Sequence, residues 1–234
     1  MIEIREITYQ ADIPLSGVLA CETGQAPRPG VLVVHEGTGL GDHAVDSARR
    51  LAQMGYCAFA ADLYGARDLP LDVAAQTVSA LKADPELLLG RLRAGLAVLA
   101  GLGEADSARL AAMGFCFGGS SVLELARDGA DLQAVICMHG ELAPLRPTNG
   151  RPLRPRVLVC VGSEDAFVSP QARLAFEDEM RAAGARWDLR IYGGVRHSFT
   201  NPQADSWNLA PFAYDAAASE DAWDAAERTL RASF

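Results

Sequence analysis

The sequence predicts an α/β fold with a mostly parallel central sheet, helices on both faces of that sheet, and an antiparallel N-terminal edge. Short, continuous apolar runs that end in glycine or polar residues are typical of strands buried on both faces. Amphipathic segments of helical length separate them, and this alternation favours a parallel sheet. The 234 residues contain no convincing linker, repeat or low-complexity stretch, so we expect a single domain over residues 1–234.

The N-terminal part of the chain changes its pattern after about thirty residues. Alternating polar and apolar residues in "IEIREITYQ" and the following "LSGVLA" predict an antiparallel hairpin. The run "GVLVVHEG" then predicts a buried strand, "AVDSARRLAQMGY" a helix, and "YCAFAADLYG" a second buried strand. The hairpin therefore forms the antiparallel edge, and the parallel part of the sheet starts after it.

The middle and C-terminal parts continue this alternation. Residues 71–101 predict two helices divided near Asp84-Pro85, because proline disfavours helix in the residue before it. Ser169 precedes a first-turn proline and predicts a helix start, and Ser219 predicts the start of the closing helix. We expect the other strands and helices, in chain order, in "ARLAAMGFC", "GGSSVLELARDG", "LQAVICMHG", "RVLVCVGSED", "SPQARLAFEDEMRAAG" and "RWDLRIYGG", with a polar loop over residues 141–155.

Charge and cysteine usage limit the classes of function. A formal net charge of −9, from 21 basic and 30 acidic residues, argues against nucleic acid or an anionic membrane as the partner. The five cysteines are widely spaced and include no CxxC pair, so neither a zinc site nor a disulfide framework is predicted. No secretory signal is visible. We expect a cytoplasmic monomer or homodimer that needs no metal or organic cofactor and acts on a small molecule.

The stretch "GFCFGG", residues 114–119, is the most informative motif. A strand, a tight glycine turn and a helix project the central side chain, here Cys116, over the sheet edge. The helix start favours thiolate, and the backbone N–H of Phe117 is placed to donate to a developing oxyanion. The alternative interpretation is a small core residue, which we adopt for Cys57, Cys137 and Cys160 inside apolar strands.

A base and an acid are expected after the nucleophile in the chain, in the order nucleophile, acid, histidine. Of the four histidines, His197 lies in a glycine-rich loop after the last predicted strand. Asp165 lies one strand–helix unit upstream, with Glu164 as its close rival. His139 also follows a predicted strand but is left without a role, and His35 is interpreted as a packing residue.

These motifs, with "GSEDAFV", "YGGVRHSFTNP", "VLVVHEGTGL", "ADLYG" and "AYDAAASEDAW", resemble the dienelactone hydrolase family of the α/β-hydrolase fold over nearly the whole chain. The resemblance implies a Cys-His-Asp triad of Cys116, His197 and Asp165. It also implies that Glu36 contacts the thiol and helps to deprotonate it when substrate arrives. The position of Glu36 then makes the backbone N–H of Gly37 the second oxyanion donor beside Phe117.

One departure from the family pattern concerns the substrate. Family members that act on dienelactone are expected to grip its carboxylate with arginine, one of them shortly after the histidine, but "HSFTNPQA" offers only Thr200 and Asn201 there. We therefore predict a hydrolase that cleaves a small carboxylic ester or lactone. The substrate is either neutral or an anion that is held differently. The alternative is a non-catalytic binding or redox-sensing protein that uses Cys116 as a reactive thiol.

Overall fold

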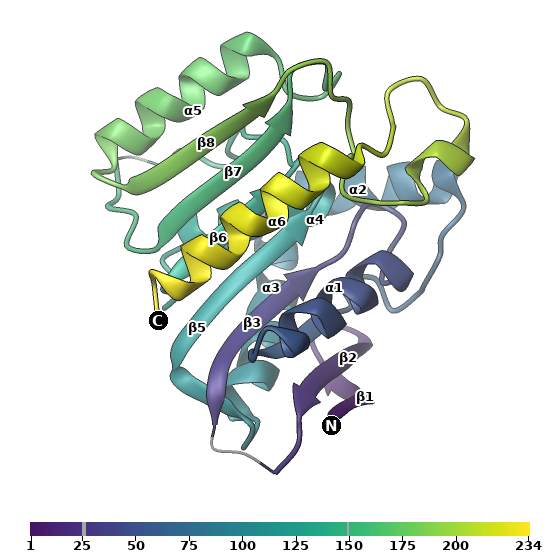
Figure 1. Ribbon diagram of the computed structural model, residues 1–234, viewed down its shortest axis with the longest axis vertical. Helices are drawn as coiled ribbons and strands as arrows, with labels where there is room; N and C mark the ends of the chain where they lie inside the picture. The colour runs from purple at the N-terminus through teal and green to yellow at the C-terminus, as the bar shows by residue number, and fades with distance from the viewer. Residues whose placement is uncertain (25–26, 149) are drawn as a thin grey trace. The chain divides into compact units, whose positions relative to one another are not determined.

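The computed structural model describes residues 1–24, 27–148 and 150–234. The chain divides into two compact units, Met1–Met113 and Gly114–Phe234, and strand β5 (Ala105–Phe115) runs through the boundary between them. Figure 1 shows the first unit from purple to teal and the second from teal to yellow. The expected single domain over residues 1–234 stays a prediction.

The first unit contains the antiparallel edge that the sequence predicts. Strands β1 and β2 form an antiparallel hairpin with Ile2 opposite Glu22 and Gln10 opposite Pro14. Strand β2 pairs antiparallel with β4, and β4 pairs parallel with β3, so the strand order in this unit is β1-β2-β4-β3-β5. The bounds of these elements are β1 (Ile2–Gln10), β2 (Pro14–Glu22), β3 (Arg28–Val34), α1 (Asp42–Gln53), β4 (Cys57–Ala61), α2 (Leu71–Ala83) and α3 (Pro85–Gly101).

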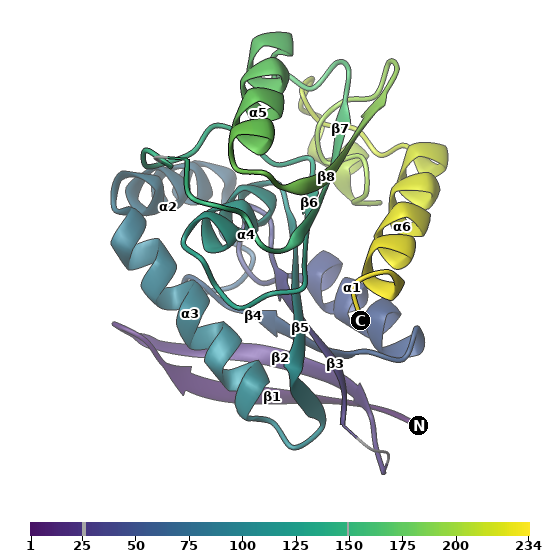
Figure 2. The same cartoon turned by 90° about the vertical axis from the view of Figure 1, so that its left-hand side faces the viewer.

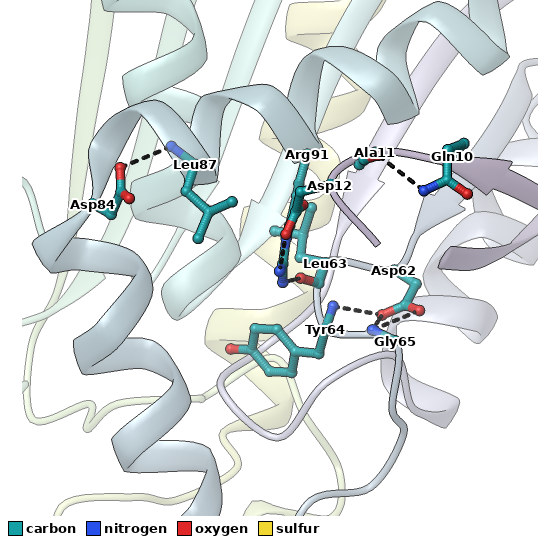
Figure 3. Close-up of polar contacts among 10 residues, drawn as sticks. All are labelled: Gln10, Ala11, Asp12, Asp62, Leu63, Tyr64, Gly65, Asp84, Leu87 and Arg91. Atoms are coloured by element: carbon teal, nitrogen blue, oxygen red, sulfur yellow. Dashed lines mark hydrogen bonds and ion pairs between the residues drawn. The ribbon is translucent and has the colours of Figure 1, made fainter. Parts of the chain in front are cut away.

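Helices cover both faces of these strands. Helices α1 and α3 both contact β3 and β4, and Figures 1 and 2 show them on opposite sides of the strands. The strands between them are buried, and Val31 to Val34 and Cys57 to Ala61 have no exposed surface. The predicted break before Pro85 is confirmed, since Asp84 caps α3 by accepting the Leu87 N–H at 3.0 Å (Figure 3).

The loop after β4 is held by polar contacts within the first unit. The carboxylate of Asp62 accepts the backbone N–H groups of Tyr64 and Gly65 at 2.8 to 3.1 Å (Figure 3). Arg91, on α3, forms a bidentate ion pair with Asp12 at 2.8 and 2.7 Å and donates to the Leu63 carbonyl. Asp62 therefore orders the "ADLYG" turn.

The second unit contains the parallel part that follows β5. Strands β6, β7 and β8 pair in parallel and in that order. Figure 2 shows α4 and α6 on opposite sides of β6, and both helices contact that strand. The bounds are α4 (Phe117–Arg127), β6 (Ala134–Met138), β7 (Arg156–Gly162), α5 (Pro170–Ala182), β8 (Arg186–Tyr192), a 3₁₀ turn η1 (Ala204–Trp207) and α6 (Ala216–Arg231).

Two local features differ from the sequence prediction. The closing helix begins at Ala216 rather than at Ser219, because Asp215 is its cap and accepts the Ala218 N–H at 2.9 Å. The prediction of a Ser219 cap is therefore wrong. The turn η1 was not predicted. The predicted Ser169 cap of α5 is confirmed by its hydrogen bond from the Ala172 N–H.

The loop over residues 141–155 carries no helix or strand among its described residues, and position 149 within it lies outside them. No helix in the described ranges has both the length and the apolar character needed to cross a membrane.

Candidate active site

Cys116 lies between the end of β5 and the start of α4, in a strained backbone conformation with φ 52° and ψ −117°. Such a conformation costs a non-glycine residue about 1–3 kcal/mol and persists only where its surroundings impose it. The neighbouring glycines are necessary for close approach. A Cβ on Gly114 would lie 2.0 Å from the Gly118 oxygen, and a Cβ on Gly119 would lie 2.9 Å from the Met138 oxygen. The turn thus presents a half-buried thiol at the N-terminus of a helix.

His197 and Asp165 are brought together from different loops of the second unit. The Nδ1 atom of His197 lies 2.8 Å from Oδ2 of Asp165, and both side chains are buried. The other carboxylate oxygen of Asp165 accepts the Phe167 N–H at 2.9 Å, which fixes the orientation of the carboxylate. The Glu164 side chain is directed instead to the Ser163 hydroxyl at 3.4 Å. The hydrogen-bonded acid is therefore Asp165.

The imidazole of His197 is in a strongly perturbed environment. Burial by itself lowers the pKa of His197, but the Cys116 sulfur and the hydrogen bond to Asp165 raise it to about 10. Nε2 is buried and has no hydrogen bond of ordinary geometry to any described residue.

The loop that carries His197 is fixed by the segment before α6. The His197 N–H donates to the Pro211 carbonyl at 3.1 Å, and the His197 carbonyl accepts the Ala213 N–H at 3.1 Å. The rings of Phe167 and Phe212 pack edge-on against the imidazole at centroid distances of 4.7 and 5.5 Å. Phe212 was not singled out from the sequence, because only the fold brings it to His197.

His139 and Thr200 are two further residues that sequence reasoning gave no role. The Nδ1 atom of His139 accepts the Cys116 backbone N–H at 3.1 Å, and its Nε2 lies 2.7 Å from the Thr200 hydroxyl. Its ring lies 5.3 Å from that of His197, centroid to centroid. The available sequence signal was the position of His139 directly after a buried strand.

Glu36 and Gly37 belong to the first unit, directly after β3. Glu36 is buried, and its Oε2 lies 3.3 Å from Nδ1 of His43. The preceding His35 is fully buried, and its ring accepts the Leu63 N–H at Nε2 and faces the Glu36 carbonyl with Nδ1. Burial lowers the pKa of His35. The interpretation of His35 as a packing residue is confirmed.

The other two cysteines of the second unit and the two serines of α4 are buried. Burial raises the pKa of Cys137 and of Cys160 to about 12, so both thiols stay protonated near neutrality. Ser120 and Ser121 lie within α4, where the Ser121 hydroxyl donates to the Phe117 carbonyl at 2.7 Å. Among the described residues, no three His, Cys, Asp or Glu side chains form a group that could hold a metal ion.

The raised pKa of His197 predicts a pH dependence of stability. Its stabilising contribution is fully present below the unfolded pKa of ~6.5 and is lost as the pH rises toward the folded value of about 10. We expect an NMR titration of His197 to show a midpoint well above that of a free imidazole. In Cys116→Ala the midpoint should fall, because one cause of the shift is removed. Cys160→Ala is the control and should leave it unchanged. Equal midpoints in all three proteins would contradict this account.

Comparisons with known proteins show the family to which the chain belongs. The family model for the dienelactone hydrolase family matches residues 15–234. A protein of Methylorubrum extorquens, provisionally named carboxymethylenebutenolidase, is 30% identical over 223 residues, which is 90% of this chain and 74% of the relative. A solved dienelactone hydrolase-like promiscuous phosphotriesterase from metagenomic libraries, P91, is 37% identical with a TM-score of 0.96 and is matched over 100% of this chain and 99% of its own.

Another solved structure, titled m3DLH, is 40% identical with a TM-score of 0.94, covering 100% of this chain and 99% of that one. The fold class predicted from the sequence, an α/β-hydrolase fold, is confirmed by these structures. The chain belongs to the dienelactone hydrolase family and is a hydrolase.

Proposed function

We propose that the protein cleaves a small carboxylic ester or lactone through acyl transfer to Cys116. The observation that carries the proposal is the half-buried thiol on a strained turn, together with an imidazole whose pKa responds both to that thiol and to Asp165. The thiolate attacks the carbonyl carbon, a C–S bond forms, and the alcohol leaves with a proton from His197. His197 then takes a proton from water, which attacks the thioester and releases the acid.

The developing negative charge on the carbonyl oxygen requires backbone donors. Phe117 is the first residue of α4, where N–H groups point out of the helix end, and we propose its N–H as one donor. The second proposed donor is the N–H of Gly37, which follows from the position of Gly37 next to Glu36.

Two arginines that were considered as carboxylate-binding groups have partners within the protein, which supports a neutral substrate. Arg196 donates to the Ala210 carbonyl at 2.9 Å, on the loop that packs against His197, and Thr200 and Asn201 replace the expected arginine. In the first unit, Arg67 pairs with Glu6 at 2.7 Å. With a net charge of −9, this supports uncharged esters and lactones over anionic ones.

The direct test is to trap the acyl-enzyme. The protein is incubated with a small aryl ester, quenched in acid and digested, and the peptides are analysed by mass spectrometry. One acyl group on the peptide that contains Cys116 is expected, with more accumulation in Asp165→Asn, because a misoriented imidazole slows hydrolysis of the thioester. Turnover without acylation, or acylation at Ser120 instead, would overturn the proposal.

We propose further that Glu36 controls the thiol, as the family resemblance implies. A carboxylate beside a thiol opposes the thiolate at rest. When substrate binds, movement of the carboxylate or transfer of the thiol proton then activates the thiol. In Glu36→Gln we expect faster alkylation of Cys116 by iodoacetamide but slower ester turnover. Glu164→Gln, which changes an acid outside the Asp165–His197 pair, is the control for both rates. If alkylation and turnover change in the same direction, Glu36 does not have this role.

A second candidate activity is the hydrolysis of phosphotriesters at the same thiol. It is favoured by the likeness to the P91 structure, which is 37% identical over the whole chain. The sulfur would form a P–S bond as the aryloxide leaves, and water would then cleave that bond. An aryl phosphotriester assay tests it. Turnover that disappears in Cys116→Ala is expected, and no turnover in the wild type would remove this candidate.

A further inference from the structure

A chain of hydrogen bonds connects the backbone of Cys116 with the loop that carries His197. The Cys116 N–H donates to Nδ1 of His139 at 3.1 Å, and Nε2 of His139 lies 2.7 Å from Oγ1 of Thr200. Thr200 is three residues beyond His197 in the same loop. His139 and Thr200 are both buried, so these bonds lie away from competing water.

This geometry assigns the tautomer of His139. A backbone N–H can donate only to a ring nitrogen that carries no proton, so Nδ1 is unprotonated and the proton is on Nε2, which donates to Thr200. His35 has the opposite arrangement, because the Leu63 N–H occupies its Nε2 and its Nδ1 faces a carbonyl oxygen at 2.6 Å. His35 therefore serves as an internal reference for the Nδ1–H tautomer in the same protein.

The acceptor on His139 supports a backbone that is under strain. Cys116 and His139 both have positive φ, at 52° and 41°. The Cys116 N–H is shared between the Met138 carbonyl at 2.9 Å and the His139 ring, while the His139 N–H donates to the Cys160 carbonyl at 2.8 Å. Strand β7 thus holds the backbone of His139, and the His139 ring and the Met138 carbonyl hold the turn that carries the thiol.

We propose that neutral His139, oriented by Thr200, is a positioning residue that fixes the Cys116 backbone relative to the His197 loop. The proposal rests on the proposed function, since Cys116 and His197 are the groups that it positions. His139 touches neither reacting atom in this scheme. Its contribution is to hold the sulfur in line with the imidazole, where a displacement of about 1 Å can cost on the order of 100-fold in rate.

The first test is spectroscopic and does not depend on activity. Long-range ¹H–¹⁵N correlation spectra of the labelled protein distinguish a protonated from an unprotonated ring nitrogen. We expect the Nε2–H tautomer for His139, assigned by the loss of its signals in His139→Asn, and the Nδ1–H tautomer for His35. A doubly protonated or Nδ1–H form of His139 at neutral pH would overturn the proposal.

The second test compares variants of the two residues. In His139→Asn the side-chain oxygen can replace Nδ1 as acceptor for the Cys116 N–H, whereas His139→Leu removes both hydrogen bonds. We expect kcat to fall about 10- to 100-fold in His139→Leu and clearly less in His139→Asn, with KM nearly unchanged in both. Thr200→Val should also lower kcat, and Thr229→Val, which changes a buried threonine of α6, should not.

Equal kcat values for the asparagine and leucine variants, or losses that appear only in KM, would overturn the positioning role. If His139→Leu does not fold, the comparison of Thr200→Val with Thr229→Val still decides. Acylation of Cys116 distinguishes a failure of the proposed function from a failure of the positioning role of His139. A wild-type protein that never acylates there refutes the proposed function, whereas normal acylation with no effect of a folded His139→Leu or of Thr200→Val refutes only the role of His139.

Discussion

Replacing Cys116 by alanine is expected to lower ester turnover by about 10⁴-fold or more while the protein stays folded. The thiol is half-buried on a turn whose strained conformation alanine can keep at similar cost, because both residues have a Cβ. No other sulfur or hydroxyl of the α4 start replaces it, since Ser120 and Ser121 lie within the helix. Initial rates with an aryl ester, together with the thermal unfolding midpoint, measure both quantities.

Cys160→Ala is the matched control for this variant. It removes a buried sulfur from β7, and we expect turnover within a few-fold of the wild type, with a small loss of stability. Full turnover by Cys116→Ala would show that the thiol does not carry the reaction. A loss in both variants would instead point to a general effect of removing a buried sulfur.

Replacing Arg127 by methionine is expected to lower the free energy of unfolding by about 3–5 kcal/mol. The guanidinium is buried, with Nε and Nη2 at 2.8 and 2.7 Å from the Glu179 carboxylate and Nη1 at 2.8 Å from Glu124. It also donates to the Leu142 carbonyl at 2.7 Å. Burial lowers the pKa of Arg127, but the two carboxylates outweigh it, and the pKa is raised. Without Arg127, the buried carboxylate of Glu124 and the partly buried carboxylate of Glu179 lose their counter-charge.

Arg181→Met is the control, because Arg181 makes comparable ion pairs on the surface. Its nitrogen atoms lie 2.8 Å from Glu177 and Asp178, but its side chain is 61% exposed. Solvent screens such pairs, so we expect a change within about 0.5 kcal/mol. Urea unfolding of both variants measures the difference. Similar losses for the two arginines would contradict the importance of burial.

The architecture was largely predictable because the sequence pattern is local. Buried parallel strands are continuous apolar runs, and the break between α2 and α3 follows from a single proline after Asp84. The start of α6 was misplaced because "DAAAS" offers two capping residues four positions apart. The choice depends on a distant contact: the Asp215 N–H donates to the Phe199 carbonyl at 3.1 Å, which ends the preceding loop at Asp215.

The candidate site was predictable only in part, because some of its contacts join residues that are far apart in the sequence. A thiol between glycines and a histidine in a glycine-rich loop can be read from short motifs, and Asp165 follows from its place after a strand. Phe212 and the pairing of His139 with Thr200 have no local signal, because residues 61 positions apart meet only when β6 and the His197 loop are folded. Such supporting contacts cannot be predicted from a single sequence.

The attachment of the His197 loop to the segment before α6 has a consequence for partial unfolding. The backbone N–H and carbonyl of His197 are hydrogen-bonded to Pro211 and Ala213. The carbonyl of Phe199 accepts the N–H of Asp215, the cap of α6. Detachment of the last helix would therefore release the imidazole even while β6, β7 and β8 remained paired. Heat or a protease acting on the C-terminal segment would thus inactivate the molecule before its sheet melts.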